Sequence, residues 1–159
     1  MNHFLAPLVF AVALLASCKS SHVASVRDTR AELLDLHEEV MRAHRESNTG
    51  LLLRAESPEH VSASRGQINQ TTLKDRRKMF ESYLGSTRFT KYVDMAPPIV
   101  RVSADGSLGW VIVQAEGEGV QTAKDGTKRP LAFESAWIEL YERRQGRWYR
   151  VGNVSNFKP

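Results

Sequence analysis

Two histidines on one predicted helix have the side chains best suited to proton transfer. The segment 31–46, AELLDLHEEVMRAHRE, places His37 and His44 two helical turns apart, so both can face the same interior. Histidine changes charge near neutral pH, as a general acid or base must. A histidine on the flank of a helix is more often only hydrogen-bonded or exposed to solvent, so both roles stay open here.

The same helix does not predict a metal site. HEEVM, residues 37–41, begins like the zinc-binding pattern HExxH, in which two histidines four positions apart bind the metal on one helical face. Met41 stands where the second histidine would have to be. We therefore expect no metal ion, and the sequence suggests no other cofactor.

Aromatic side chains gather in the second half of the chain. They offer large apolar surfaces for a hydrophobic core, a dimer interface or a ligand pocket, and their pattern does not choose among the three. The residues are Trp110, Phe133, Trp137, Tyr141, Trp148 and Tyr149.

The single cysteine, Cys18, follows an uncharged apolar segment, FLAPLVFAVALLA at residues 4–16. That segment is shorter than the roughly 20 residues that a membrane-spanning helix needs. It has the length of the apolar region of a secretory signal peptide. One cysteine has no partner for a disulfide bond within the chain, and a catalytic thiol is not expected at this position.

Residues 15–18, Leu-Ala-Ser-Cys, resemble the bacterial lipobox. The resemblance implies that the sulfur of Cys18 receives a diacylglycerol and that residues 1–17 are removed as a signal peptide. Two or three acyl chains anchor a protein stably, whereas one does so only marginally. The alternative is an ordinary secretory signal with an incidental cysteine. Lys19, in place of Asp, favours the outer membrane if the host has one, with the domain facing the periplasm or the exterior.

The rest of the chain has the size of one domain. All charged residues lie beyond residue 17 and give a formal net charge of +4. This mild excess suits an anionic surface or ligand but does not predict nucleic-acid binding. We divide the chain into a signal peptide at 1–17, the lipidated cysteine and a short tether at 18–25, and a domain at 26–159.

The hydrophobic pattern of the domain changes from helical to strand-like. Helices are predicted at 31–46 and 73–84, with a short helical turn at 51–53. The charged run KDRRK, residues 74–78, is read as a solvated helix face. Turn signals such as Asp125-Gly126 indicate consecutive hairpins, and the longest strands require a strongly bent sheet. The strands are predicted at 60–64, 88–95, 99–103, 108–121, 131–143 and 147–156.

This order of elements resembles the NTF2-like superfamily, in particular its SnoaL-like and DUF4440-like members. The similarity is carried by YVDMAPPIVRVSADGSLGWVIVQAEGEG and by FESAWIELYERRQGRWYRVGNVSN, and it covers roughly residues 26–157. It implies an α+β fold: a cone in which N-terminal helices pack on a strongly curved antiparallel sheet and leave an apolar pocket. The superfamily includes isomerases and dehydratases as well as non-catalytic binding domains, so the fold does not decide the activity.

An enzyme similar to ketosteroid isomerase needs a carboxylate base and acidic donors for an oxyanion in this pocket. Glu56, Glu59 and His60 lie near the first strand but match no motif. Glu134 and Glu139 lie on opposite faces of one strand, so only one of them can point inward. We assign no catalytic residue.

We therefore predict a membrane-tethered envelope lipoprotein whose domain binds a small apolar ligand or a protein partner without catalysis, with a homodimer as a further candidate. The alternative is a ketosteroid-isomerase-like or dehydratase-like enzyme that uses a pocket His or Glu for proton transfer. The side chains expected to line the pocket are His37, Met41, His44, Trp110, Glu134, Trp137 and Asn153.

Replacing the cysteine tests the lipid anchor. We expect the Cys18→Ser chain to carry no lipid, because serine has no thiol to receive the diacylglycerol, and to be either uncleaved or released in soluble form. Metabolic labelling with palmitate followed by membrane fractionation measures both. A cleaved, palmitate-labelled species would show that the lipobox assignment is wrong.

Overall fold

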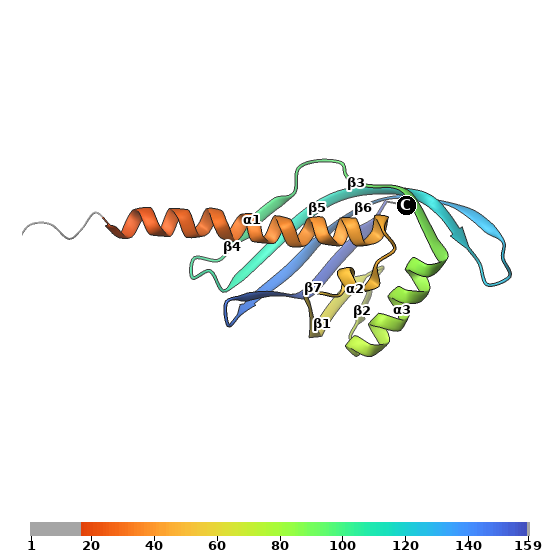
Figure 1. The fold of residues 1–159 in the computed structure, drawn as a ribbon, viewed down its shortest axis with the longest axis horizontal. Helices are drawn as coiled ribbons and strands as arrows, with labels where there is room; N and C mark the ends of the chain where they lie inside the picture. Colours follow the sequence, from red (N-terminus) through yellow and green to blue (C-terminus); the bar gives the residue numbers. More distant parts are fainter. Residues whose placement is uncertain (1–16, 159) are drawn as a thin grey trace, which may run out of the picture.

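A long helix lies against the inner face of a curved sheet. The computed structural model describes residues 17–158, with side chains described from residue 28 onward. The predicted signal peptide therefore lies outside the described residues, except for Ser17. Helix α1 (Ser17–Arg45) extends well beyond the edge of the sheet, while α2 (Thr49–Leu52) and α3 (Leu73–Ser86) lie at its other end (Figure 1). Among residues 17–158, no helix is both long and apolar enough to cross a membrane.

The sheet contains seven strands in the order β2-β1-β7-β6-β5-β3, with β4 also paired to β5. Strands β3 and β4 pair with different parts of β5, so they occupy the same edge of the sheet. The bounds are β1 (Glu56–Ser64), β2 (Gln67–Asn69), β3 (Thr87–Asp94), β4 (Ile99–Val102), β5 (Leu108–Thr122), β6 (Lys128–Arg144) and β7 (Arg147–Phe157).

The predicted antiparallel sheet is wrong at one pairing. Strands β1 and β7 run parallel, with Val61 beside Gly152 and Ser64 beside Ser155, so the sheet is mixed. Strand β2, which pairs with the end of β1, was not predicted. Hydrophobic alternation reports which residues share a face but not which distant strand pairs with which. The other predicted strands are confirmed, with shifted ends.

The predicted inner side of α1 is confirmed, because Leu33, His37, Val40, Met41 and His44 are all buried. The helix starts earlier than expected, so residues 18–25, the predicted tether, are helical.

The N-terminus of α3 is capped by Thr72, whose side-chain oxygen accepts a hydrogen bond from the backbone N–H of Asp75. The reading of KDRRK as a fully solvated face is wrong for one residue. Arg76 is only 5% exposed, because it pairs with a buried carboxylate on β1.

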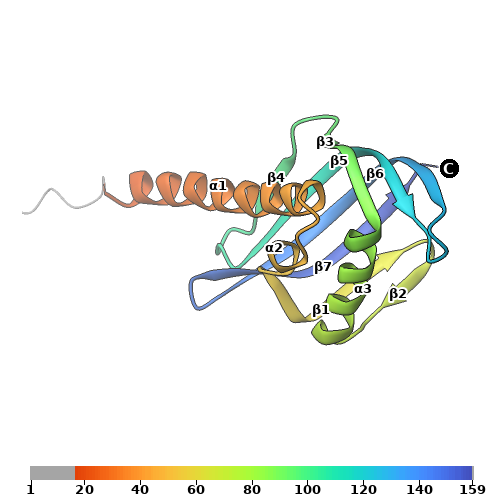
Figure 2. The same ribbon diagram turned by 45° about the vertical axis from the view of Figure 1, so that its right-hand side comes forward.

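The backbones of β3 and β5 approach each other closely near the C-terminal end of β5. Strand β3 has a bulge between Phe89 and Lys91, opposite Gly119. A Cβ atom on Gly119 would lie 2.2 Å from the carbonyl oxygen of Arg88. Glycine at position 119 therefore permits the close approach of β3 to β5. Figure 2 shows the long strands β5 and β6 curving at this end of the sheet, near α3.

Two glycine substitutions test this contact. We expect Gly119→Ala to lower the free energy of unfolding by about 1–3 kcal/mol, since the added methyl group would collide with backbone that cannot move aside easily. Gly85→Ala in α3 is the matched control. Its Cβ would meet no atom within 4 Å, and alanine favours a helix by about 0.5–1 kcal/mol. Urea unfolding of both variants measures the difference, and equal stabilities would contradict the assignment.

Candidate functional site

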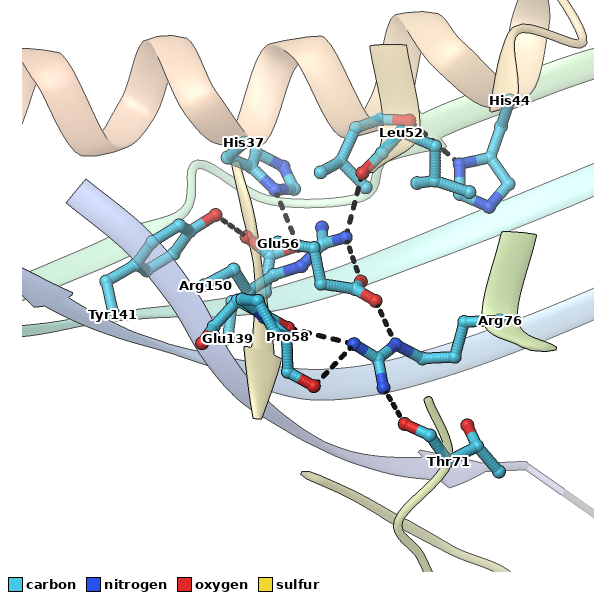
Figure 3. Close-up of polar contacts among 12 residues, drawn as sticks. His37, His44, Leu52, Glu56, Pro58, Thr71, Arg76, Glu139, Tyr141 and Arg150 are labelled. Atoms are coloured by element: carbon cyan, nitrogen blue, oxygen red, sulfur yellow. Dashed lines mark hydrogen bonds and ion pairs between the residues drawn. The ribbon is translucent and has the colours of Figure 1, made fainter. Parts of the chain in front are cut away.

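A buried histidine bridges the helix to two strands of the sheet. His37 on α1 is 2% exposed. Its Nε2 atom lies 3.1 Å from both carboxylate oxygens of Asp94 at the end of β3. Its Nδ1 atom lies 3.5 Å from Oε1 of Glu139 on β6 (Figure 3). The sequence pointed to His37, but nothing in it identified Asp94, which ends a strand as a single acidic residue.

Glu139 is the most enclosed carboxylate of the site, at 1% exposed. The hydroxyl of Tyr141 donates a hydrogen bond of 2.7 Å to Oε2, and the indole N–H of Trp137 donates one of 3.0 Å to Oε1. Burial alone would raise the pKa of Glu139, but the hydrogen bond and positive charge of His37, together with Arg150 and Tyr141, lower it to about 2. Glu139 is therefore an anion held by neighbouring donors.

A second buried ion cluster continues from the first across the base of the cone. Arg150 on β7 donates to Oε2 of Glu56 on β1 at 2.9 Å and to the carbonyl oxygen of Leu52 at 2.9 Å. Arg76 on α3 donates to the other oxygen of Glu56 and, at 2.8 Å, to the carbonyl of Ser57 (Figure 3). The positive charge of Arg150 also helps to hold Glu139 ionised. The two clusters are thus coupled by charge, and together they are called the interior network below.

His44 does not join His37 in a common site. Its Nδ1 atom lies 2.8 Å from the carbonyl oxygen of Val40, and its ring stacks on Tyr92 with centroids 4.3 Å apart. Burial lowers the pKa of His44 to about 4, and burial has the same effect on His60 near Glu56. Both are neutral at pH 7, whereas His37 faces two carboxylates.

The other predicted pocket residues are divided between the two faces of the sheet. Met41 belongs to the apolar core. Trp137 and Asn153 lie on the inner face, where Asn153 pairs with Glu139 across the strands. Trp110 and Glu134 lie on the outer face, because they alternate with the buried Val111 and Ser135. The interior position expected for Trp110 and Glu134 is therefore wrong.

Arg150 and Arg76 belong to the interior network but were missed from the sequence. The alternation that puts Trp148 inward also puts Arg150 inward, which is a signal that could have been used. For Arg76 there was no signal, because it sits in a charged run. Within the described part of the chain, no group of three acidic, histidine or cysteine side chains is arranged to hold a metal ion.

An apolar row crosses the outer face of the sheet. Cross-strand pairing aligns side chains from six strands, and the row has no charged member. Several members are partly or largely exposed: the exposed fraction is 49% for Ile99, 41% for Ile112, 48% for Val154 and 78% for Ile68. A shallow hollow of about 260 Å³ lies on it at β5, β6 and β7. This outer row consists of Ile99, Ile112, Ile138, Val154, Ala63 and Ile68.

Solved structures resemble this arrangement of helices and sheet over most of its length. An NTF2-like protein from Cytophaga hutchinsonii matches 81% of this chain and 98% of its own, with 15% identity and a TM-score of 0.64. The chain has the NTF2-like fold. A ketosteroid isomerase-like protein from Erwinia carotovora matches with a TM-score of 0.58 and 15% identity, covering 82% of this chain and 97% of that one.

A third solved structure matches almost the whole chain. It is assigned as a calcium/calmodulin dependent protein kinase II association domain from Xanthomonas campestris. It has 19% identity and a TM-score of 0.55, with coverage of 98% and 99% of the two chains. No family model and no curated protein matches the sequence. The predicted α+β cone is confirmed, apart from the parallel pairing in its sheet.

Removing one donor tests the interior network. We expect Tyr141→Phe to lower the free energy of unfolding by about 1.5–3 kcal/mol, the range for a hydrogen bond to a charged group, because Glu139 loses a donor that water cannot replace. Tyr149→Phe is the control, since the Tyr149 ring is partly exposed beside Arg144 and Arg147. Chemical denaturation at pH 7 compares them, and similar losses would refute the role of the Tyr141 hydroxyl.

Proposed function

We propose that this chain is a lipid-anchored protein of the bacterial envelope whose NTF2-like domain is a non-catalytic docking module. Its docking surface is the outer row, and its partner is a second copy of the chain. The observation that carries the proposal is the uncharged apolar row across six strands. Of the two partners considered from the sequence, a small apolar molecule and a protein, this geometry favours the protein.

The interior network supports a structural use of the cone. Both ring nitrogens of His37 contact carboxylates, and Glu139 receives donors from Trp137 and Tyr141. A proton-transfer enzyme instead directs such groups at a substrate atom within about 3 Å. In this domain the titratable side chains satisfy each other, which argues against the ketosteroid-isomerase-like or dehydratase-like alternative.

The outer face is large enough to form most of a stable interface. Six of its large apolar side chains are between 36% and 78% exposed: Val61, Ile68, Ile99, Ile112, Leu140 and Val154. These side chains can form the apolar centre of an interface, and a standard interface buries about 800 Å² per partner. A polar rim supplies the remainder in typical interfaces. Two sheets can pack face to face at about 10 Å with interdigitating side chains.

The charges around the outer row suit a second copy of the same chain. Glu142 and Arg144 form an ion pair of 2.6 Å at one end of the long strands. Lys91 and Glu116 form another, of 2.8 Å, on the neighbouring edge. The end of the long strands and the β3 edge of the sheet thus each carry both signs. In a two-fold dimer the same surface meets itself, so mixed charges allow opposite signs to meet whichever ends come together. The assignment of the Xanthomonas neighbour as an association domain agrees with this use of the fold.

The membrane part of the proposal rests on the lipobox at residues 15–18. Because α1 begins at Ser17, the lipid on Cys18 would be attached at the start of the helix that crosses the domain. Part of α1 extends beyond the sheet (Figure 1), which would hold the outer row away from the lipid surface and accessible to another copy. Lys19 favours the outer membrane in a host that has one.

A charge placed in the outer row tests the docking surface. We expect the full chain in density-matched detergent to sediment as a dimer and Ile112→Glu to sediment as a monomer, because dimerisation would bury an unpaired carboxylate. The dimer affinity should fall at least about 100-fold, the scale of losing a central contact.

Met79→Glu is the matched control for that experiment. Met79 is 55% exposed on α3, away from the outer row, and its variant should remain a dimer. A monomeric parent chain at about 100 µM, or an Ile112→Glu chain that still dimerises, would reject the proposal. Circular dichroism verifies that each variant is folded.

A further inference from the structure

Both ring nitrogens of His37 face groups that can only accept hydrogen bonds. Nε2 faces the two oxygens of Asp94, and Nδ1 faces Oε1 of Glu139. A neutral imidazole has one N–H donor and one lone pair, whereas the imidazolium ion has two donors. A neutral ring would therefore direct a lone pair at a carboxylate, whichever tautomer it adopted. When both carboxyl groups are ionised, this arrangement matches the charged ring, which has one N–H donor for each of them.

The charge balance of the interior network leads to the same conclusion. Without a charge on His37, its carboxylates outnumber its cations. With His37 protonated, three cations face three anions, and a buried network of this kind is stable only when each charge is compensated. The cations are His37, Arg150 and Arg76, and the anions are Asp94, Glu139 and Glu56.

We propose that His37 is a protonated pin that fastens α1 to β3 and β6, and that loss of its proton at alkaline pH releases this part of α1 from the sheet. The inference is independent of the docking surface. It adds a pH-dependent function to the structural role of the interior network: the network holds α1, the helix that contains Cys18, more strongly at low pH than at high pH.

The groups that face His37 come from every element packed around it. Strand β3 contributes Asp94, and β7 contributes Arg150, whose charge acts on Glu139. On β4 and β5 the buried Val100, Val111 and Val113 are apolar and form one core cluster with Met41 of α1. His44 is two turns along α1 but bonds to a backbone carbonyl. Strand β6 contributes Glu139, Tyr141 and the ring of Trp137, 6.4 Å from that of His37.

The direction of the pKa shift agrees with the geometry. Burial alone would lower the pKa of His37, but the hydrogen bond and charge of Glu139, and then Asp94, outweigh burial and raise the pKa above 6.5. A histidine with a raised pKa in the folded state contributes full stability below its unfolded pKa. That contribution is lost as the pH rises through the folded pKa. The relevant window therefore begins near pH 6.5 and extends upward.

Two measurements on the full chain in detergent micelles test the pin. Titration of the His37 ring by NMR should give a pKa above 6.5, with the resonance assigned by its absence in His37→Gln. Hydrogen exchange, corrected for the intrinsic effect of pH, should show protection of α1 falling relative to α3 between pH 6.5 and 9. Between the unfolded and folded pKa values, one proton changes the equilibrium by about tenfold per pH unit.

His44→Gln is the matched control, because it removes a buried histidine from the same helix that is already neutral in this window. It should retain the pH dependence of α1 exchange, and His37→Gln should lose it. A His37 pKa at or below 6.5 would overturn the proposal, as would the same pH dependence in His37→Gln as in the parent chain. If His37→Gln does not fold, NMR titration of the histidines in the parent chain shows which ring loses its proton at the pH where α1 loses protection. The proposal requires that this ring is His37.

Discussion

The burial of the Glu139 carboxylate is the constraint on which much of the domain depends. A buried ion is tolerated only when nearby donors and opposite charges replace the water it has lost, and an unpaired one costs several kcal/mol. The donors come from Trp137 and Tyr141 on the same strand and from His37 on α1. For His37 to reach Glu139, α1 must adopt a specific rotation about its axis and a specific distance from the sheet. Apolar packing of Leu33 and Met41 alone would constrain both less strictly.

Glu56 imposes a similar constraint at the other end of the domain. Its two oxygens are held by Arg150 of β7 and Arg76 of α3, so one side chain ties β1 to the end of the chain and to the helix that covers it. These ion pairs thus help to define the relative positions of β1, β7 and α3. The cost is that the cone interior is occupied by its own charges. Alternation places the apolar side chains that the core does not use on the outer face of the sheet, which is the docking surface proposed above.

The features that follow from local periodicity could be predicted, and those that follow from distant pairing could not. Period-two alternation along β5 and β6 correctly gave the strands and showed that Glu134 and Glu139 face opposite ways. It was not applied to Trp110, whose neighbour Val111 occupies the core position. Asp94 and Arg76 belong to the interior network only because their ion-pair partners lie on other elements. A hydrophobic pattern along the sequence does not report such partners. The parallel neighbour of β1 was unpredictable for the same reason.

The parallel pairing of β1 with β7 has a consequence for how the domain is made. Strand β1 pairs with β2 on one side and with β7 (Arg147–Phe157) on the other, so the β1–β2 hairpin joins the rest of the sheet only when β7 is available. Contacts between such distant segments slow folding, because the chain loses the entropy of closing a large loop before these contacts can stabilise it. A chain emerging amino terminus first would expose one edge of β1 until β7 has been synthesised. The eleven residues of β7 thus join the β1–β2 hairpin to the rest of the sheet and complete the domain.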